Sequence, residues 1–110
     1  MTGDLVRGPR KKKYHLCICG REGAYLFICS NGYEHDFAIR NADCHGVPNF
    51  VSYISAGRII RKTDFSKRAK VVCTVNDIFL QGLLDHLAAT PVLPEAERAI
   101  LCDLLSRHLD

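Results

Sequence analysis

The sequence contains no tryptophan and a single methionine among its 110 residues. It also lacks any apolar run near the roughly 20 residues that a membrane-spanning helix needs, and its basic N-terminus is not followed by an apolar stretch. We therefore expect no membrane span and no secretory signal, and we place the protein in the cytoplasm. Phosphate-binding Gly-rich loops, H-E-x-x-H zinc motifs, G-x-S-x-G motifs and Rossmann fingerprints are absent too, which argues against the common large enzyme classes.

What is present is an ordinary globular composition, with 47% hydrophobic and 25% charged residues. A chain of this length buries roughly two-thirds of its unfolded surface. The chain is therefore long enough to form a core without the disulfide framework on which very small domains depend. We expect a basic N-terminal lead over residues 1–13 that is mobile or lies along the surface, followed by a single domain over residues 14–110.

Charge is distributed unevenly along the chain. Residues 1–70 carry 13 Lys or Arg against 6 Asp or Glu, a net charge of +7, whereas residues 71–110 carry 2 against 6, a net charge of −4. A basic body suits a polyanionic partner, because lysine and arginine gain from counterion release near phosphates. A solvated basic surface without a partner explains the same pattern equally well.

Six cysteines lie at positions 17, 19, 29, 44, 73 and 102. Several stand in apolar segments, where a free thiol packs as a small hydrophobic group, and a reducing cytoplasm would keep them free. A zinc site built from Cys29, His35, Cys44 and His45 is an alternative, but the spacing lacks the paired knuckles of structural zinc sites. We therefore expect neither a metal nor another cofactor.

Residue patterns predict strands first and helices last. Residues 14–19 and 24–30 read as two strands joined by the turn 20–23. Further short strands are predicted over 37–40 and 71–73, and residues 50–54 and 58–61 are predicted to form two short strands or a strand with a helical turn. A helix capped by Thr74 and Asp77 ends at Thr90-Pro91, and a second runs from Pro94, as its first residue, to His108. This order predicts an α+β fold with a small antiparallel, barrel-like sheet.

Several segments, taken in order, resemble the MazF/PemK/CcdB-like toxin family. They are Gly3-Asp4-Leu5-Val6, Lys12-Lys13-Tyr14-His15-Leu16-Cys17-Ile18-Cys19, Ala24-Tyr25-Leu26-Phe27-Ile28-Cys29-Ser30, and Ser52-Tyr53-Ile54 with Arg58-Ile59-Ile60. The resemblance covers most of residues 3–88. It implies a small SH3-like antiparallel barrel with a terminal helix, to which this chain adds a second C-terminal helix.

The resemblance further implies the toxin of a toxin–antitoxin system, a homodimer that cleaves single-stranded RNA without metal and is restrained by an antitoxin protein. It assigns Arg10 or Lys13 as the cation that stabilises the phosphate and Ser30 as a hydrogen-bond donor to it. His35 is a candidate acid or base because imidazole titrates near neutrality. The cations expected along the RNA are Lys11, Lys12, Arg58, Arg61 and Lys62.

Each of these residues also has a plainer interpretation. Ser30 suits an ordinary turn, His35 an exposed loop, and His15 a structural position within a strand. At the level of function, the alternative to the ribonuclease is a non-catalytic module of the same fold that binds nucleic acid or blocks a protein such as a topoisomerase. A small zinc-binding protein is the third hypothesis.

Overall fold

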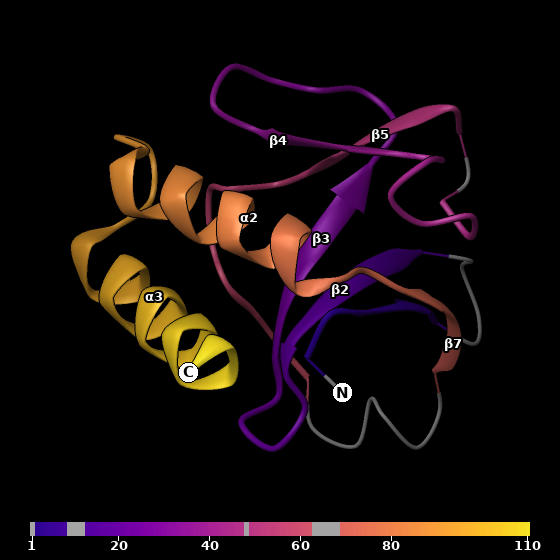
Figure 1. Ribbon diagram of the computed structural model, residues 1–110. Coiled ribbons are helices and arrows are strands. Elements are labelled where there is room, and N and C mark those ends of the chain that lie inside the picture. The colour runs from indigo at the N-terminus through magenta and orange to yellow at the C-terminus, as the bar shows by residue number, and fades with distance from the viewer. Residues whose placement is uncertain (1, 9–12, 48, 63–68) are drawn as a thin grey trace.

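Figure 1 shows the computed structural model of the chain, which describes residues 2–8, 13–47, 49–62 and 69–110. Within these ranges the chain forms strands first and helices last. In chain order the elements are β1 (Asp4–Arg7), β2 (Tyr14–Cys19), β3 (Ala24–Cys29), β4 (Phe37–Arg40), β5 (Val51–Ile54), β6 (Ile60–Arg61), β7 (Lys70–Thr74), α2 (Asp77–Ala89) and α3 (Glu95–Leu109). The predicted α+β class is therefore confirmed.

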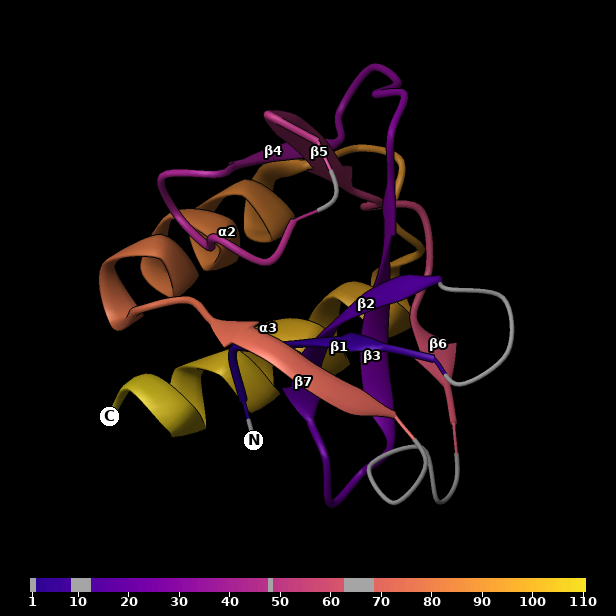
Figure 2. The ribbon, with the colours of Figure 1, turned by 90° about the vertical axis from the view of Figure 1, so that its right-hand side faces the viewer.

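All the strands belong to one curled antiparallel sheet with the order β4-β5-β3-β2-β1-β7. Strand β3 holds two partners on one side: its end pairs with β5, and its start pairs with the short strand β6. The loop 41–47 that follows β4 reaches β7 across the open side of the sheet (Figure 2). The sheet is thus a half-barrel with edges at β4 and β7.

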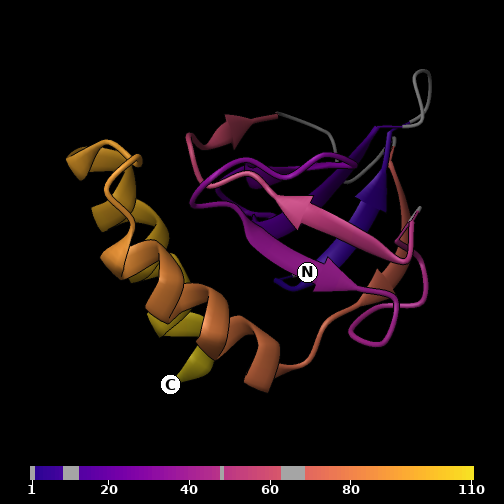
Figure 3. The same ribbon diagram turned by 90° about the horizontal axis from the view of Figure 1, so that it is seen from above.

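The main core lies between the sheet and the helices. Strand residues alternate in direction, so Leu16 and Leu26 face this core together with Leu83 of α2 and Leu101 of α3, all fully buried. The two helices pack against each other and cover one side of the sheet (Figure 3). Each such leucine contributes about 1.5–3 kcal/mol relative to an exposed position.

The intervening strand residues face the other side of the sheet. Val6, Cys17 and Tyr25 form a second, smaller buried cluster there, with Ile60 and Ala69 packed against it. His15 and Phe27 continue the same alternation one step along β2 and β3, and they are paired across the two strands. His15 and Phe27 therefore lie on the side of the sheet opposite the main core.

The start of α2 differs from the sequence prediction. Asn76 is the capping residue, and its side-chain oxygen accepts a hydrogen bond of 2.9 Å from the backbone N–H of Phe79. Thr74 belongs to β7 instead, where its hydroxyl donates to Asp4 at 2.7 Å. Helix α3 begins after Pro94. Neither helix in the described part of the chain is long and apolar enough to cross a membrane.

The prediction that residues 1–13 form a lead outside the domain is wrong for residues 4–7. These residues form β1, which lies between β2 and β7 in the sheet. Leu5 is fully buried and Val6 nearly so, so burial on both faces holds this segment in place. Residues 4–7 therefore belong to the sheet.

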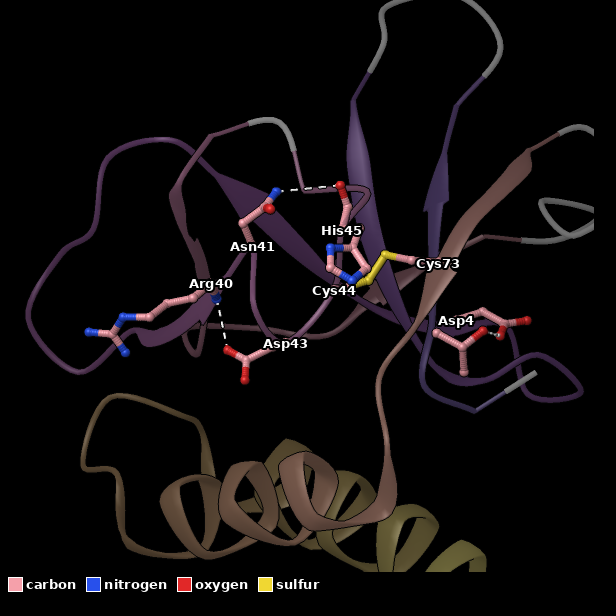
Figure 4. The surroundings of a disulfide bond; sticks show 8 residues. Asp4, Arg40, Asn41, Asp43, Cys44, His45 and Cys73 are labelled. Carbon is pink, nitrogen blue, oxygen red and sulfur yellow. Dashed lines mark hydrogen bonds between the residues drawn. A yellow bond between two sulfur atoms is a disulfide. The ribbon is translucent and has the colours of Figure 1, made fainter.

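Two of the cysteines are joined rather than free. Cys44, in the loop after β4, forms a disulfide with Cys73 of β7, and their Cα atoms are 5.8 Å apart (Figure 4). Gly46 lies so close to β7 that a Cβ there would stand 2.9 Å from the Val72 side chain. The disulfide therefore fastens the loop across the gap between the two edges of the sheet. Among the remaining cysteines, Cys17, Cys19, Cys29 and Cys102 are free.

Candidate functional site

A pocket opens on the face of the sheet that the helices do not cover, and we call it the basic pocket. Its cavity volume is about 350 Å³. Residues from the starts and ends of several strands line it: Lys13, His15, Phe27, Ser55, Arg58, Ile60 and Lys62. The pocket thus gathers segments from β2, β3, β5 and β6 that are far apart in the sequence.

The sheet fixes the positions of these side chains. A hydrogen bond of 2.8 Å from the N–H of Ser55 to the carbonyl of Phe27 extends the pairing of β5 with β3 to the wall of the pocket. Lys13 directly precedes β2, and its ammonium lies 6.0 Å from the centroid of the Phe27 ring. Lysine and phenylalanine at this distance have a weak cation–π attraction, which holds the lysine over the pocket.

Lys62 is placed by the turn between β2 and β3. Its backbone N–H donates to the carbonyl of Gly23 at 3.0 Å. Gly23 has φ +65°, and a Cβ on it would lie 2.7 Å from the carbonyl oxygen of Lys62. Only glycine permits this close approach without strain, so the turn residue determines where the end of β6 and Lys62 lie.

Among the described residues that line the pocket, His15 is the one buried polar side chain, with 6% of its surface exposed. Its ring packs edge-on against Phe27, with centroids 5.4 Å apart. Burial, together with the positive charges of Lys62 and Lys13, lowers the pKa of His15 from 6.5 to about 4. The imidazole is therefore neutral near pH 7.

No acidic side chain lines the basic pocket among the residues described. A larger cavity of about 610 Å³ lies between α3 and the β2–β3 turn, but it mixes charges of both signs, including Arg107 and Glu22. In that region Arg107 pairs with Asp103 at 2.8 Å. Within the described part of the chain, the lining of the basic pocket thus carries positive charge alone, and the chemistry it offers is the binding of an anion.

The structure brings together some of the predicted site residues and separates others. Lys13, Arg58 and Lys62 meet in the basic pocket. Arg61 lies elsewhere because neighbouring strand residues point to opposite faces; its guanidinium donates to the carbonyl of Glu22 and lines a cavity beside α3. Arg10, Lys11 and Lys12 lie outside the described residues.

Ser30 and His35 are not among the described lining residues of the pocket. Ser30 follows the end of β3 as an exposed residue. His35 lies in a loop beside α2, where its carbonyl accepts a hydrogen bond from Nε2 of His86, and its own Nε2 is 3.6 Å from the Glu34 carboxylate. The geometry therefore does not join these two residues to the three cations.

The structure also bears on the zinc alternative. Cys44 is bonded to Cys73 and so is not available as a thiolate ligand. The thiol of Cys29 lies 3.2 Å from the carbonyl oxygen of Asn31, to which it donates. Among the described residues, no group of three or more His, Cys, Asp or Glu is arranged to hold a metal ion.

The sequence analysis does not place four of the lining residues at the site: His15, Phe27, Ser55 and Ile60. From sequence, His15 is expected to be structural, and Phe27 is expected either to stack on a base or to belong to the core. The alternation of β2 held a usable signal, because His15 shares the direction of Lys13 and is opposite to Leu16. The approach of Arg58 and Lys62 to that strand had no local signal, since it depends on the pairing of β6 with β3.

Comparison of the chain with family models, with curated proteins and with solved structures finds no significant match. The basic pocket is therefore interpreted from its own geometry.

Proposed function

We propose that the protein binds single-stranded RNA and holds a backbone phosphate in the basic pocket. The observation that carries this proposal is the convergence of Lys13, Arg58 and Lys62 in one cavity whose described lining includes no acidic residue. A phosphodiester placed there would meet three cations and release the counterions bound to them and to the RNA. Such a site provides affinity for the backbone rather than for a sequence.

The apolar part of the pocket favours a nucleotide over a simple anion. Phe27 and Ile60 line it beside the cations, and an aromatic ring offers a surface against which an unstacked base can pack. The cavity volume of about 350 Å³ falls in the range of roughly 300–1,000 Å³ typical of small-molecule sites. Unpaired bases are accessible in single strands, which is why we name single-stranded RNA.

Cleavage of the bound strand is the second candidate function, and the specific observation that favours it is the cationic site with an imidazole among its lining residues. In this reaction the 2′-oxygen attacks phosphorus, the bond to the 5′-oxygen breaks, and a 2′,3′-cyclic phosphate remains. The proton of the 2′-hydroxyl leaves to a base, and the 5′-oxygen gains one. Lys13 and Lys62 would stabilise the charge that develops on the phosphate.

The toxin assignment, the SH3-like barrel, the homodimer and the antitoxin partner remain proposals that rest on the family resemblance. A non-catalytic RNA-binding module fits the same pocket. Binding and cleavage are therefore tested separately.

The binding test measures the affinity of a fluorescent single-stranded RNA by anisotropy over a series of salt concentrations. Lys13→Ala, Arg58→Ala and Lys62→Ala each remove one cation from the pocket. We expect each to weaken binding and to reduce the slope of log affinity against log salt by about 0.7, the value for one phosphate contact on a single strand. Arg21→Ala is the matched control, because Arg21 is a cation outside the basic pocket.

Equal losses in Arg21→Ala and in the three pocket variants would show a diffuse charge effect and contradict the proposed site. Loss on Ser30→Ala with the pocket variants unaffected would move the site to the end of β3, as the family resemblance implies.

The cleavage test incubates the protein with a long mixed-sequence RNA in EDTA and maps the ends of the products. Discrete cuts with 2′,3′-cyclic phosphate ends, lost in Lys13→Ala, would establish a metal-independent ribonuclease. Intact RNA that is nevertheless bound would establish the non-catalytic module.

A further inference from the structure

Phosphate binding by three cations leaves one feature of the basic pocket without a role, namely the imidazole of His15. The ring comes from the central strand β2 and is nearly buried. A buried histidine on the cation-lined side of a sheet is costly unless it remains neutral, because its charged form would add a fourth positive charge to the site.

Among the described residues that line the basic pocket with His15, the side chains carry positive charge or none. Lys13 precedes β2, Arg58 precedes β6 and Lys62 follows β6. The side chains of Phe27 in β3 and Ser55 after β5 carry no charge near neutral pH. None of these described neighbours is a carboxylate. Burial and the two lysines are the causes that hold the pKa of His15 near 4.

A phosphodiester in the pocket would reverse the sign of this local field. It brings a negative charge to within a few ångströms of the lysine ammonium groups and of the ring, and an anion near an imidazole favours the protonated form. The same anion offsets the repulsion from Lys13 and Lys62. Protonation of His15 and binding of phosphate therefore favour each other.

We propose that His15 takes up a proton when an RNA phosphate enters the basic pocket, so that the bound phosphate is held by four positive groups rather than three. This inference rests on the proposed RNA binding. The proton comes from solvent, and the imidazolium donates an N–H to a phosphate oxygen. RNA binding should then strengthen as the pH falls, by up to about tenfold for each pH unit over which a full proton is taken up.

The test uses a short oligouridylate with 2′-O-methyl groups. Its diester phosphates and uracil bases keep their charge from about pH 8 to about pH 5, the range in which histidines titrate, and it has no 2′-hydroxyl to react. The titration of His15 is followed by NMR in the free protein and in the complex. We expect the midpoint of the His15 titration to be higher in the complex than in the free protein.

Affinity is measured in parallel over the same pH range for the wild type, His15→Gln and the control His45→Gln. We expect the wild type and His45→Gln to bind more tightly at low pH and His15→Gln to lose this dependence. If the oligonucleotide binds through Lys13 and Lys62 but His15 titrates alike in the free and bound protein, the inference is overturned and the proposed function stands. If the oligonucleotide does not bind, the proposed function fails and the inference fails with it. Should His15→Gln not fold, the NMR titration of the wild type decides alone.

Discussion

At the scale of single residues, the basic pocket combines groups that disfavour one another in the free protein. Lys13, Lys62 and the buried His15 share one cavity, and the imidazole remains neutral there because burial and the two lysines disfavour its charged form. Charges arranged in this way are stabilised by a ligand of the opposite sign rather than by their neighbours. The cost of that arrangement is measurable in the stability of the protein.

The first residue-scale prediction concerns acid stability. The neutral form of His15 is favoured by folding, because the pKa is about 4 in the folded chain against 6.5 for an unperturbed histidine. Its contribution is therefore fully present above pH 6.5 and is lost as the pH falls from 6.5 through about 4. The full difference corresponds to about 3 kcal/mol.

Urea unfolding near neutral pH and at about pH 4.5 measures this effect, and comparison of each protein with itself removes the direct cost of substitution. We expect the wild type to lose about 2–3 kcal/mol more than His15→Gln over this interval. His45→Gln, which changes an exposed histidine, should behave as the wild type. Equal losses in all three proteins would contradict the burial of a neutral imidazole.

Gly23 gives the second residue-scale prediction. An alanine there must adopt a positive φ and press against the carbonyl of Lys62, so we expect Gly23→Ala to cost about 1–3 kcal/mol. Gly57→Ala is the matched control, because nothing lies within 4 Å of the added Cβ. It should be neutral or stabilise the fold by about 0.4–1 kcal/mol. Thermal unfolding of the pair checks the difference, and a Gly23→Ala variant as stable as Gly57→Ala would contradict it.

At the scale of elements, a disulfide links two segments of the half-barrel that do not pair as strands. The loop 41–47 follows edge strand β4, and β7 is the opposite edge; Cys44 and Cys73 join them (Figure 4). A reducing cytoplasm, which the sequence analysis predicts, would keep these two cysteines as reduced, unbonded thiols. The fastening of the loop therefore depends on the redox conditions around the protein.

This cross-link closes a loop with a sequence separation of 29 residues, so the chain-entropy estimate of its contribution is about 3–4 kcal/mol. We expect Cys44→Ser to lower the free energy of unfolding by about this amount relative to the oxidised wild type. Adding a thiol reductant should bring the wild type to the stability of the variant and leave the variant unchanged. A wild type indifferent to reductant would show that the bond is not formed in solution.

At the scale of the whole molecule, the local parts of the fold were predictable and the long-range parts were not. The bounds of β2 and β4 follow from their runs of apolar and β-branched residues, and the helices follow from their 3.6-residue period. By contrast, β1 has four residues, and nothing within 1–13 shows that it pairs with β7 some 65 residues later. Pairing over such distances is a property of the folded sheet.

The candidate site divides in the same way. That Lys13, Arg58 and Lys62 are cations is visible in the sequence, whereas their meeting in one pocket is a result of the fold. Arg61 lies outside the basic pocket because of the direction in which its side chain leaves β6. His15 belongs to the pocket because β6 lies beside β3. The disulfide was also missed, because the proximity of Cys44 to Cys73 arises only when the sheet curls.

The whole-molecule prediction concerns the domain boundary. A chain limited to residues 14–110 would lack β1, which lies between β2 and β7 and buries Leu5 and Val6. We expect this shortened chain to lose the cooperative unfolding transition of the full chain, as followed by circular dichroism and urea. A transition at an unchanged midpoint would instead support the boundary at residue 14.

The central place of β1 also bears on how the protein is made. During synthesis β1 can pair with β2 as soon as β2 emerges, but the other edge of β1 has no partner until β7 has been synthesised. Contacts of such high sequence separation slow folding. A strand edge that is still unpaired promotes aggregation until its partner strand is available. The nascent chain therefore has an interval in which chaperones and neighbouring chains compete for β1, and the yield of folded protein should depend on the rate of translation.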